Sequence, residues 1–165
     1  MKLSTKGQYA VSAMADLAKT SQRSEGSKPV SLSDIALRQG ISLTYLEQLF
    51  GKLRRHGLVL GQRGPGGGYL LAASPADTRI LDIMFAVDEP IKTTRCDGDH
   101  TLGCAKDHAR CLTHDLWSEL GHMIEMFLGS VSLEDVINRR NLSPYGISGF
   151  LRNEAQKTST TEVAL

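Results

Sequence analysis

The chain has 165 residues, 41% of them apolar and 22% charged, which is typical of a soluble globular protein. No run approaches the roughly 18 apolar residues of a membrane span, and MKLSTKGQYAV at the N-terminus lacks the apolar core of a signal peptide. We therefore expect a cytoplasmic protein with no membrane partner. Residues 1–63 carry ten Lys/Arg against four Asp/Glu, whereas residues 64–165 carry nine against fourteen. A basic first half favours a polyanionic partner. The alternative is that the two halves merely expose solvated faces of different charge.

Helical spacing of apolar residues predicts a first helix from about residue 5 to residue 22. A polar connection over 21–29 separates it from a second helix over 32–39. Ser31 is the expected N-cap of this second helix, and Gly40 is well placed as its C′ residue.

After a tight turn, Ser42 can cap a third helix that ends before Gly57. Two helices joined by a short glycine-containing turn form a helix-turn-helix pattern, although many helical hairpins share it. The face of the third helix expected to lie in the core comprises Leu46, Leu49, Phe50 and Leu53. The opposite face carries Thr44, Gln48, Lys52 and Arg55, with Glu47 beside it.

Two short strands are expected next, at 58–63 and 69–72, around the glycine-rich turn 64–68. A helix-turn-helix followed at once by such a hairpin, with Arg63 at its base, indicates a winged helix. A phosphate-binding loop is the alternative, but it needs Lys-Ser/Thr and a helix after the last glycine, and Tyr69 begins a strand-like run instead. We expect a mainly α fold: a winged helix-turn-helix with a small β-hairpin wing and a long dimerisation helix.

All three cysteines lie in one polar stretch, CDGDHTLGCAKDHARCLTH, which runs from Cys96 to His114. Thiolates and imidazole suit zinc, iron or an iron–sulfur cluster. The spacing C-x7-C-x6-C-x2-H is wider than the C-x2–4-C pairs of structural zinc sites. A Cys3His zinc site, a thiol–disulfide switch and three incidental free thiols stay open. A redox enzyme is disfavoured, because no second cofactor motif or catalytic constellation accompanies the cysteines.

Beyond the hairpin, a fourth helix is expected near residues 80–87, stopped at Pro90. A long helix over 112–128 carries an apolar stripe with little of its own chain left to cover it, so we expect a second subunit to pack there. Packing against its own domain is the alternative. A last short helix over 132–140 should be capped by Ser132, and the tail from 141 should be disordered.

This organisation divides the chain into four parts. We expect a winged-helix DNA-binding domain at 1–90, a loop that binds a metal ion or cluster at 91–111, a dimerisation helix with the C-terminal helix at 112–140, and a disordered tail at 141–165.

Several stretches together resemble one known family. They are RGPGGGY at 63–69, LSTKGQYAV near the N-terminus, ISLTYLEQLFGKLR in the third helix, and CLTHDLW after the last cysteine. They are similar to the iron–sulfur cluster regulators, a group of dimeric bacterial winged-helix transcription regulators. The resemblance covers roughly residues 1–140. The CLTH piece discriminates best, because relatives that sense nitric oxide or iron usually lack its histidine.

The resemblance implies a [2Fe–2S] cluster bound by Cys96, Cys104, Cys111 and His114. The intervals are longer than expected for the group and bring His100 and His108 into the loop as rival ligands. Gln8 stands near the position where a nitric-oxide-sensing relative supplies a carboxylate, which favours His114. The resemblance also implies a homodimer, not an enzyme, that binds double-stranded operator DNA and regulates cluster-biogenesis genes. The cluster assembly machinery would supply its cluster.

The basic half should contact the DNA. Gln48 suits adenine and Thr44 a base edge, whereas Glu47 would be satisfied only by a donor such as cytosine N4. Pairing of Glu47 with a nearby arginine is the alternative. Arg63 on the wing suits a minor groove. The predicted DNA-contacting residues are Lys6, Ser42, Thr44, Tyr45, Glu47, Gln48, Lys52, Arg54, Arg55 and Arg63.

Overall fold

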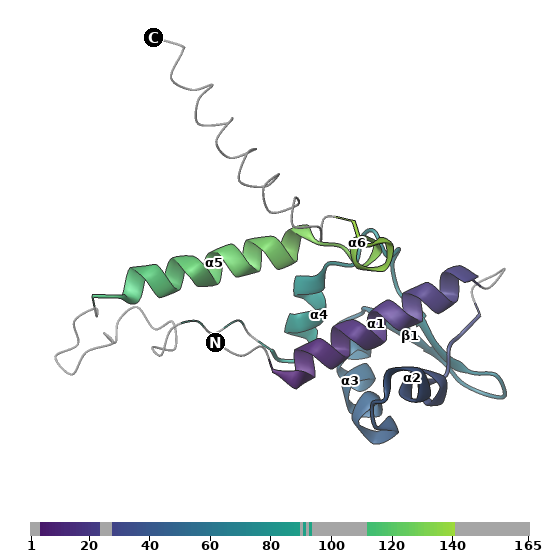
Figure 1. Cartoon of the computed structure of the whole chain (residues 1–165). Coiled ribbons are helices and arrows are strands. Elements are labelled where there is room, and N and C mark those ends of the chain that lie inside the picture. Colours follow the sequence, from purple (N-terminus) through teal and green to yellow (C-terminus); the bar gives the residue numbers. More distant parts are fainter. Residues whose placement is uncertain (1–3, 24–27, 90, 92, 94–111, 141–165) are drawn as a thin grey trace, which may run out of the picture.

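The computed structural model describes residues 4–23, 28–89, 91, 93 and 112–140. Its helices and one antiparallel hairpin follow each other in the predicted order (Figure 1). The helices are α1 (Thr5–Arg23), α2 (Leu32–Gln39), α3 (Leu43–Arg55), α4 (Ile80–Ala86), α5 (His114–Ser130) and α6 (Leu133–Asn138), and the strands are β1 (Val59–Gln62) and β2 (Gly68–Leu71).

The helix-turn-helix, formed by α2 and α3, has the predicted caps. Ser31 Oγ accepts a hydrogen bond from the Asp34 amide at 3.1 Å, and Ser42 Oγ accepts one from the Tyr45 amide at 3.2 Å. Each hydroxyl satisfies an amide that has no partner within its helix. Gly40 adopts the left-handed conformation, with φ of 64°, and so ends α2 where predicted.

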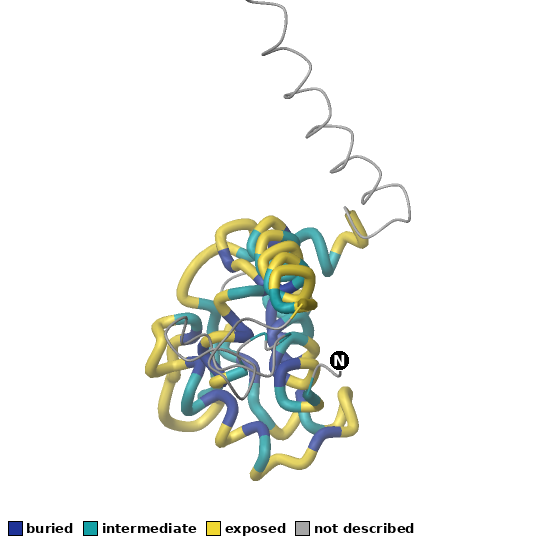
Figure 2. Tube along the Cα trace, turned by 90° about the vertical axis from the view of Figure 1, so that its left-hand side faces the viewer, coloured by how far each residue is buried: buried dark blue, intermediate teal, exposed yellow. Residues whose placement is uncertain are grey.

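The core collects one apolar face from each element of the N-terminal part. The α3 residues predicted for the core are all buried, and the face of α1 that begins at Ala10 lies against them. Burial of these two stripes is the main force that holds the helix-turn-helix on α1. We call the part from α1 to α4, with the hairpin, the N-terminal body. Its inner turns are blue in Figure 2.

A third segment completes the wing. Val59 of β1 pairs with Leu71 of β2, and Val30 forms an isolated bridge with Tyr69 through two backbone hydrogen bonds of 2.9 and 2.8 Å. This bridge was not predicted, because a single bridging residue leaves no periodic pattern in the sequence. Gly68 is required there, since a Cβ would overlap the Val30 carbonyl oxygen.

The segment before α4 is joined to the segment before α6. The amide of Ile80 donates to Val131 O at 3.0 Å, and the amide of Leu133 donates to Thr78 O at 2.8 Å. Ser132 caps α6, as predicted, and forms a reciprocal capping box with Asp135. These bonds return the chain to the N-terminal body after α5.

The long helix α5 begins two residues later than predicted and projects away from the body (Figure 1). Gly121 is its one buried residue. Phe127 and Leu128, near its C-terminal end, pack partly against the core. The remaining apolar stripe is open, with Leu116 64%, Trp117 44%, Met123 48% and Met126 56% exposed. Within the described residues, no helix is long and apolar enough to span a membrane.

Candidate nucleic-acid interface and metal ligands

The exposed side of α3 is the candidate DNA-reading surface. Thr44, Glu47, Gln48, Arg54 and Arg55 are exposed, as expected for side chains that reach a groove. They point away from the core because their buried neighbours on the same helix take the opposite side. The geometry leaves these five side chains available to a ligand.

Two predicted contacts at the start of α3 already have structural roles. Ser42 Oγ is engaged as the N-cap, although its hydroxyl can still donate. Tyr45 is half-buried, and its ring meets the edge of the Tyr9 ring at a centroid distance of 6.0 Å and an interplanar angle of 82°. This ring pair joins α1 to α3, so Tyr45 is less accessible than its neighbours.

Glu47 has no ion-pair partner among the residues that the structure describes. This observation removes the described arginines as its partner. An exposed carboxylate on a basic surface is repelled by phosphate, and in the major groove it can accept only from base amino groups such as cytosine N4. Its chemistry therefore favours discrimination between sequences over affinity.

Lys52 and Lys6 meet the acidic pair that follows α4. Lys52 Nζ lies 2.5 Å from Asp88 Oδ2. Lys6 Nζ donates to the Asp88 carbonyl oxygen at 2.8 Å and lies 3.8 Å from Glu89 Oε2. The hydrogen bond and charge of Lys52 lower the pKa of Asp88, with smaller contributions from Lys6 and His56. Two lysines predicted to bind phosphate are thus paired within the chain.

Sequence reasoning missed this acidic pair. Asp88 and Lys52 are 36 positions apart, and no periodic pattern connects a residue of α3 with a residue in the turn after α4. The available signal was the adjacent carboxylates of Asp88 and Glu89, placed directly after a helix expected to pack in a basic domain.

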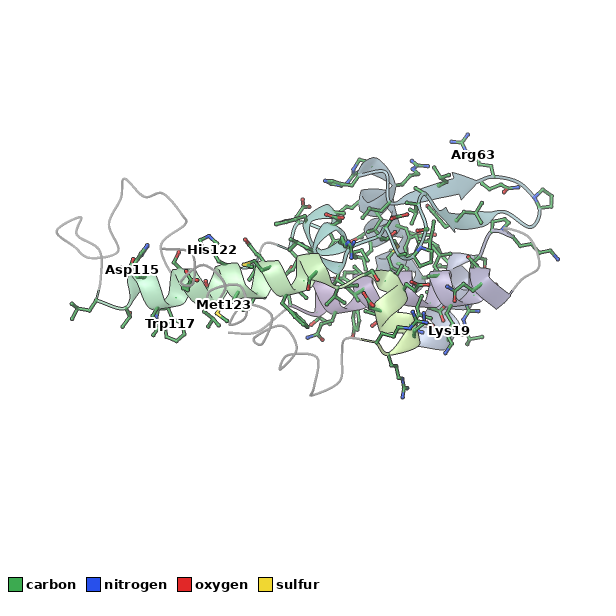
Figure 3. All side chains as sticks on the ribbon, turned by 90° about the horizontal axis from the view of Figure 1, so that it is seen from above. Lys19, Arg63, Asp115, Trp117, His122 and Met123 are labelled. Atoms are coloured by element: carbon green, nitrogen blue, oxygen red, sulfur yellow. The ribbon has the colours of Figure 1, made fainter. Side chains whose placement is uncertain are left out.

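Arg63 lies on the wing, immediately after β1, and is exposed. In Figure 3 its side chain projects from the hairpin away from the rest of the molecule. The amide of Gly67 donates to Gly64 O at 2.9 Å and closes the wing turn. This placement suits a cation that enters a groove beside the one occupied by a reading helix.

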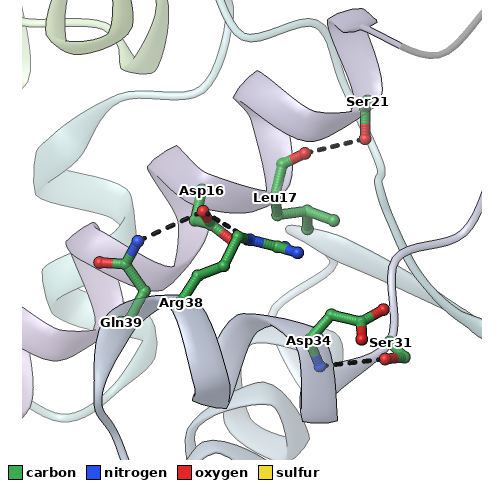
Figure 4. Close-up of polar contacts among 7 residues, drawn as sticks. All are labelled: Asp16, Leu17, Ser21, Ser31, Asp34, Arg38 and Gln39. Carbon is green, nitrogen blue, oxygen red and sulfur yellow. Dashed lines mark hydrogen bonds and ion pairs between the residues drawn. The ribbon is translucent and has the colours of Figure 1, made fainter.

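An ion pair also holds the helix-turn-helix on α1 (Figure 4). Arg38 donates from Nη2 and Nε to Asp16 Oδ2 at 2.7 and 3.0 Å, and Gln39 Nε2 donates to Asp16 Oδ1 at 3.2 Å. The hydrogen bond to Asp16 raises the pKa of the Arg38 guanidinium. This Arg38–Asp16 clamp orients α2, which in turn positions α3. No pattern in the sequence predicts it.

The predicted metal ligands are described only in part. Cys96, Cys104 and Cys111 lie outside the described residues, as do His100 and His108. His114 is the first residue of α5 and is half-buried, and Gln8 on α1 is exposed. Within the described part of the chain, no group of three or more His, Cys, Asp or Glu side chains could hold a metal ion.

The donor chemistry nevertheless fits a thiophilic centre. Three thiolates and one imidazole match the ligands that iron–sulfur clusters and zinc accept. His114 stands at the N-terminal end of α5, directly after the cysteine stretch, so a centre bound there would be continuous with this helix.

Comparisons with known proteins agree with this geometry. Residues 3–139 match the Rrf2 family model, described as an iron-dependent transcriptional regulator. The HTH-type transcriptional regulator IscR of Photorhabdus laumondii is 51% identical over 142 residues, covering 86% of this chain and 82% of the relative. The solved structure of IscR from T. potens is 37% identical with a TM-score of 0.66, covering 84% of this chain and 88% of that chain. CymR, the global cysteine regulator of B. subtilis, is 33% identical with a TM-score of 0.67, covering 84% and 98%.

These relatives are transcriptional regulators and not enzymes, and the solved structures of T. potens IscR and B. subtilis CymR share this fold. The predictions of a winged-helix fold and of a DNA-binding transcription regulator are therefore confirmed. The chain belongs to the Rrf2 family of iron-dependent transcriptional regulators.

Proposed function

We propose that this regulator senses iron–sulfur cluster status and binds operator DNA as a homodimer, in order to adjust transcription of cluster-biogenesis genes. The observation that carries the proposal is the Cys3His donor set that ends at His114, the first residue of α5. The name IscR borne by relatives up to 51% identical supports it. In a cytoplasmic setting the thiols would stay reduced and could receive a cluster from the assembly machinery.

Cys96, Cys104, Cys111 and His114 would hold a [2Fe–2S] cluster, which supplies a reducible and detachable centre when bound. One imidazole in place of a thiolate removes a negative charge and adds a ligand with its own pKa. Because imidazole binds iron less firmly than thiolate, His114 would let the protein lose its cluster when supply fails. His100 and His108 are the rival ligands in this proposal.

DNA would bind to the exposed side of α3. Gln48 would pair with adenine, Thr44 would touch a base edge, and Glu47 would accept from cytosine N4. Arg63 would enter the adjacent minor groove, and the remaining cations would neutralise phosphates. The exposure of these side chains on one helix and on the wing next to it supports this assignment.

A second copy of the chain would cover α5. Its exposed apolar side chains and its projection from the body leave a surface that the described residues of its own chain do not cover. In Figure 3, Trp117 and Met123 lie on the opposite side of α5 from His122, so one side of the helix is apolar. A two-fold dimer formed there would set the spacing of two α3 helices, about 34 Å for successive major grooves. Cluster binding beside the start of α5 would then bias that spacing.

The test begins with anaerobic purification, an absorption spectrum, and iron, sulfide and zinc analysis. We expect visible bands with about two iron and two sulfide per chain, lost in Cys104→Ala and Cys111→Ala. His114→Cys should keep the bands and slow cluster loss. His100→Ala and His108→Ala are matched controls that should change neither.

Operator binding by the loaded and the cluster-free protein is then compared. Different operator affinities of the two forms are expected. A colourless protein with one zinc per chain, or reversible disulfide formation without metal, would overturn cluster sensing. Either result would leave the DNA-binding assignment in place.

A further inference from the structure

Asp88 is held from two sides by lysines of the DNA-binding half. Lys52 of α3 contacts its carboxylate, and Lys6 of α1 donates to its carbonyl oxygen. Asp88 has a φ of 54°, which is uncommon for a residue other than glycine and is tolerated best by Asp and Asn. Lys52 therefore holds the Asp88 carboxylate beside α3, while Lys6 holds the Asp88 backbone.

The carboxylate of Asp88 and a DNA phosphate have the same chemistry toward an ammonium group. Both are anionic oxygen acceptors that shorten and strengthen a hydrogen bond from Lys Nζ. Lys52 lies one helical turn from Gln48 on the same helix, beside the exposed reading surface. The Lys52 ammonium must therefore leave Asp88, or bind Asp88 and the phosphate together, in order to neutralise a phosphate.

The pair is suited to exchange. The Lys52 side chain is 30% exposed and that of Asp88 67% exposed, so both groups are accessible to solvent and to a ligand. Exposed ion pairs are weak and are screened by salt. A dense row of phosphates can displace a single exposed carboxylate.

We propose that Asp88 is an intramolecular competitor of DNA phosphate for Lys52 and so restrains DNA binding. The proposal rests on the assignment of the exposed side of α3 as the DNA interface. Asp88 occupies the lysine in the free protein, and phosphate replaces it in the complex. Because Asp88 stands eight positions before Cys96, the competitor is attached to the segment that carries the proposed cluster ligands.

The competition has a thermodynamic signature. DNA binding releases counterions in proportion to the phosphates that are neutralised, with a slope of about −0.9 per phosphate in log K against log salt. When Lys52 exchanges Asp88 for phosphate, the freed carboxylate attracts a counterion from solution. This uptake reduces the net number of counterions released. Without the carboxylate, the affinity and the steepness of the salt dependence should both rise.

The test measures binding of a fluorescent operator duplex to the full-length protein at several salt concentrations. Asp88→Asn removes the charge and keeps a residue that tolerates positive φ. We expect a roughly two- to five-fold gain in affinity at low salt, the range that follows from releasing one exposed ion pair, and a steeper slope by up to about one. Asp82→Asn is the matched control, because Asp82 is an exposed carboxylate on α4 with no ion pair among the described residues.

A double-mutant cycle assigns the effect to the pair. Lys52→Gln should weaken binding, and Asp88→Asn should add no gain in that background. Equal effects of Asp88→Asn and Asp82→Asn, a loss of affinity in Asp88→Asn, or a gain that persists with Gln at position 52 would overturn the competition. If Lys52→Gln leaves binding unchanged, then the role of Lys52 at the DNA interface fails together with the competition.

Discussion

The N-terminal body and α5 use apolar side chains in opposite ways. In the body, each helix turns its apolar face toward the others. Helix α3, for example, buries Leu46, Leu49, Phe50 and Leu53. In α5, a helix of similar length and stronger apolar character buries only Gly121. In Figure 2 the turns of α5 are yellow and teal, whereas the body below them has a blue interior. The body is stabilised by contacts within one chain, whereas α5 presents the same kind of surface outward.

On the proposed assignment, DNA reading by α3 and assembly by α5 use separate parts of the chain. The core face of α3, the proposed reading helix, is enclosed, which fixes the geometry of its polar outer face. Helix α5 is attached through its C-terminal end, by Phe127, Leu128 and the bonds around Val131. Its N-terminal end, where His114 begins the helix, is the end most open to influence by a bound centre or a partner.

The strongest test of the contrast is one truncation made in both regions. Leu46→Ala in the body should lower the free energy of unfolding by about 2–5 kcal/mol, because Leu46 is fully buried and its loss leaves a cavity. Leu116→Ala in α5 removes the same atoms from a side chain that is 64% exposed, and should cost less than about 0.5 kcal/mol in dilute protein. Urea unfolding at low protein concentration measures both. Equal losses would mean that α5 is buried within its own chain.

A charge placed on α5 should separate assembly from folding. Trp117→Glu is expected to raise the dissociation constant of the homodimer at least about 30-fold, since truncation of a central interface aromatic costs about 2 kcal/mol or more. Helix content should stay unchanged, because Trp117 is already 44% exposed in the single chain.

Leu37→Glu is the matched control for that charge. Leu37 is 85% exposed on α2, outside the apolar side of α5, so the same substitution should leave the dimer intact. Sedimentation velocity over a concentration series follows both variants. A monomeric wild type, or a dimer that tolerates Glu at 117, would show that α5 is not the assembly surface.

The sequence predicted the parts of this contrast that depend on local chemistry. Ser31, Gly40 and Ser42 mark the ends of their helices because capping is decided within a few residues. The α3 core face followed from helical periodicity. Periodicity shows that α5 has an apolar stripe, but it cannot tell which part the body covers.

Contacts between distant segments were not predictable in the same way. The Lys52–Asp88 pair, the Arg38–Asp16 clamp and the Val30 bridge each join elements whose juxtaposition depends on the whole fold. Of the proposed metal ligands, only His114 lies among the described residues, so the ligand set stays a prediction. The DNA-contacting set also stays a prediction, although the structure places most of its members on one exposed surface.

Two glycines sharpen the contrast inside the body, where close packing and an open helix surface occur side by side. Gly68→Ala should lower the free energy of unfolding by about 1–3 kcal/mol, because its Cβ would overlap the Val30 carbonyl oxygen and break the bridge to Tyr69. Gly51→Ala, in the interior of α3, should raise it by about 0.5–1 kcal/mol, because alanine favours a helix and its Cβ meets no atom within 4 Å.

The same methyl group is added in both variants, so urea unfolding of the pair cancels the effect of glycine on the unfolded chain, and the difference reports the surroundings in the folded state. Opposite signs are expected. A stabilising alanine at 68 would mean that Val30 and β2 can separate without loss, and that the wing is not fixed to the body through this bridge. If Gly51→Ala destabilises the protein, then another group, such as the second copy of the chain, packs against this side of α3 in the free protein.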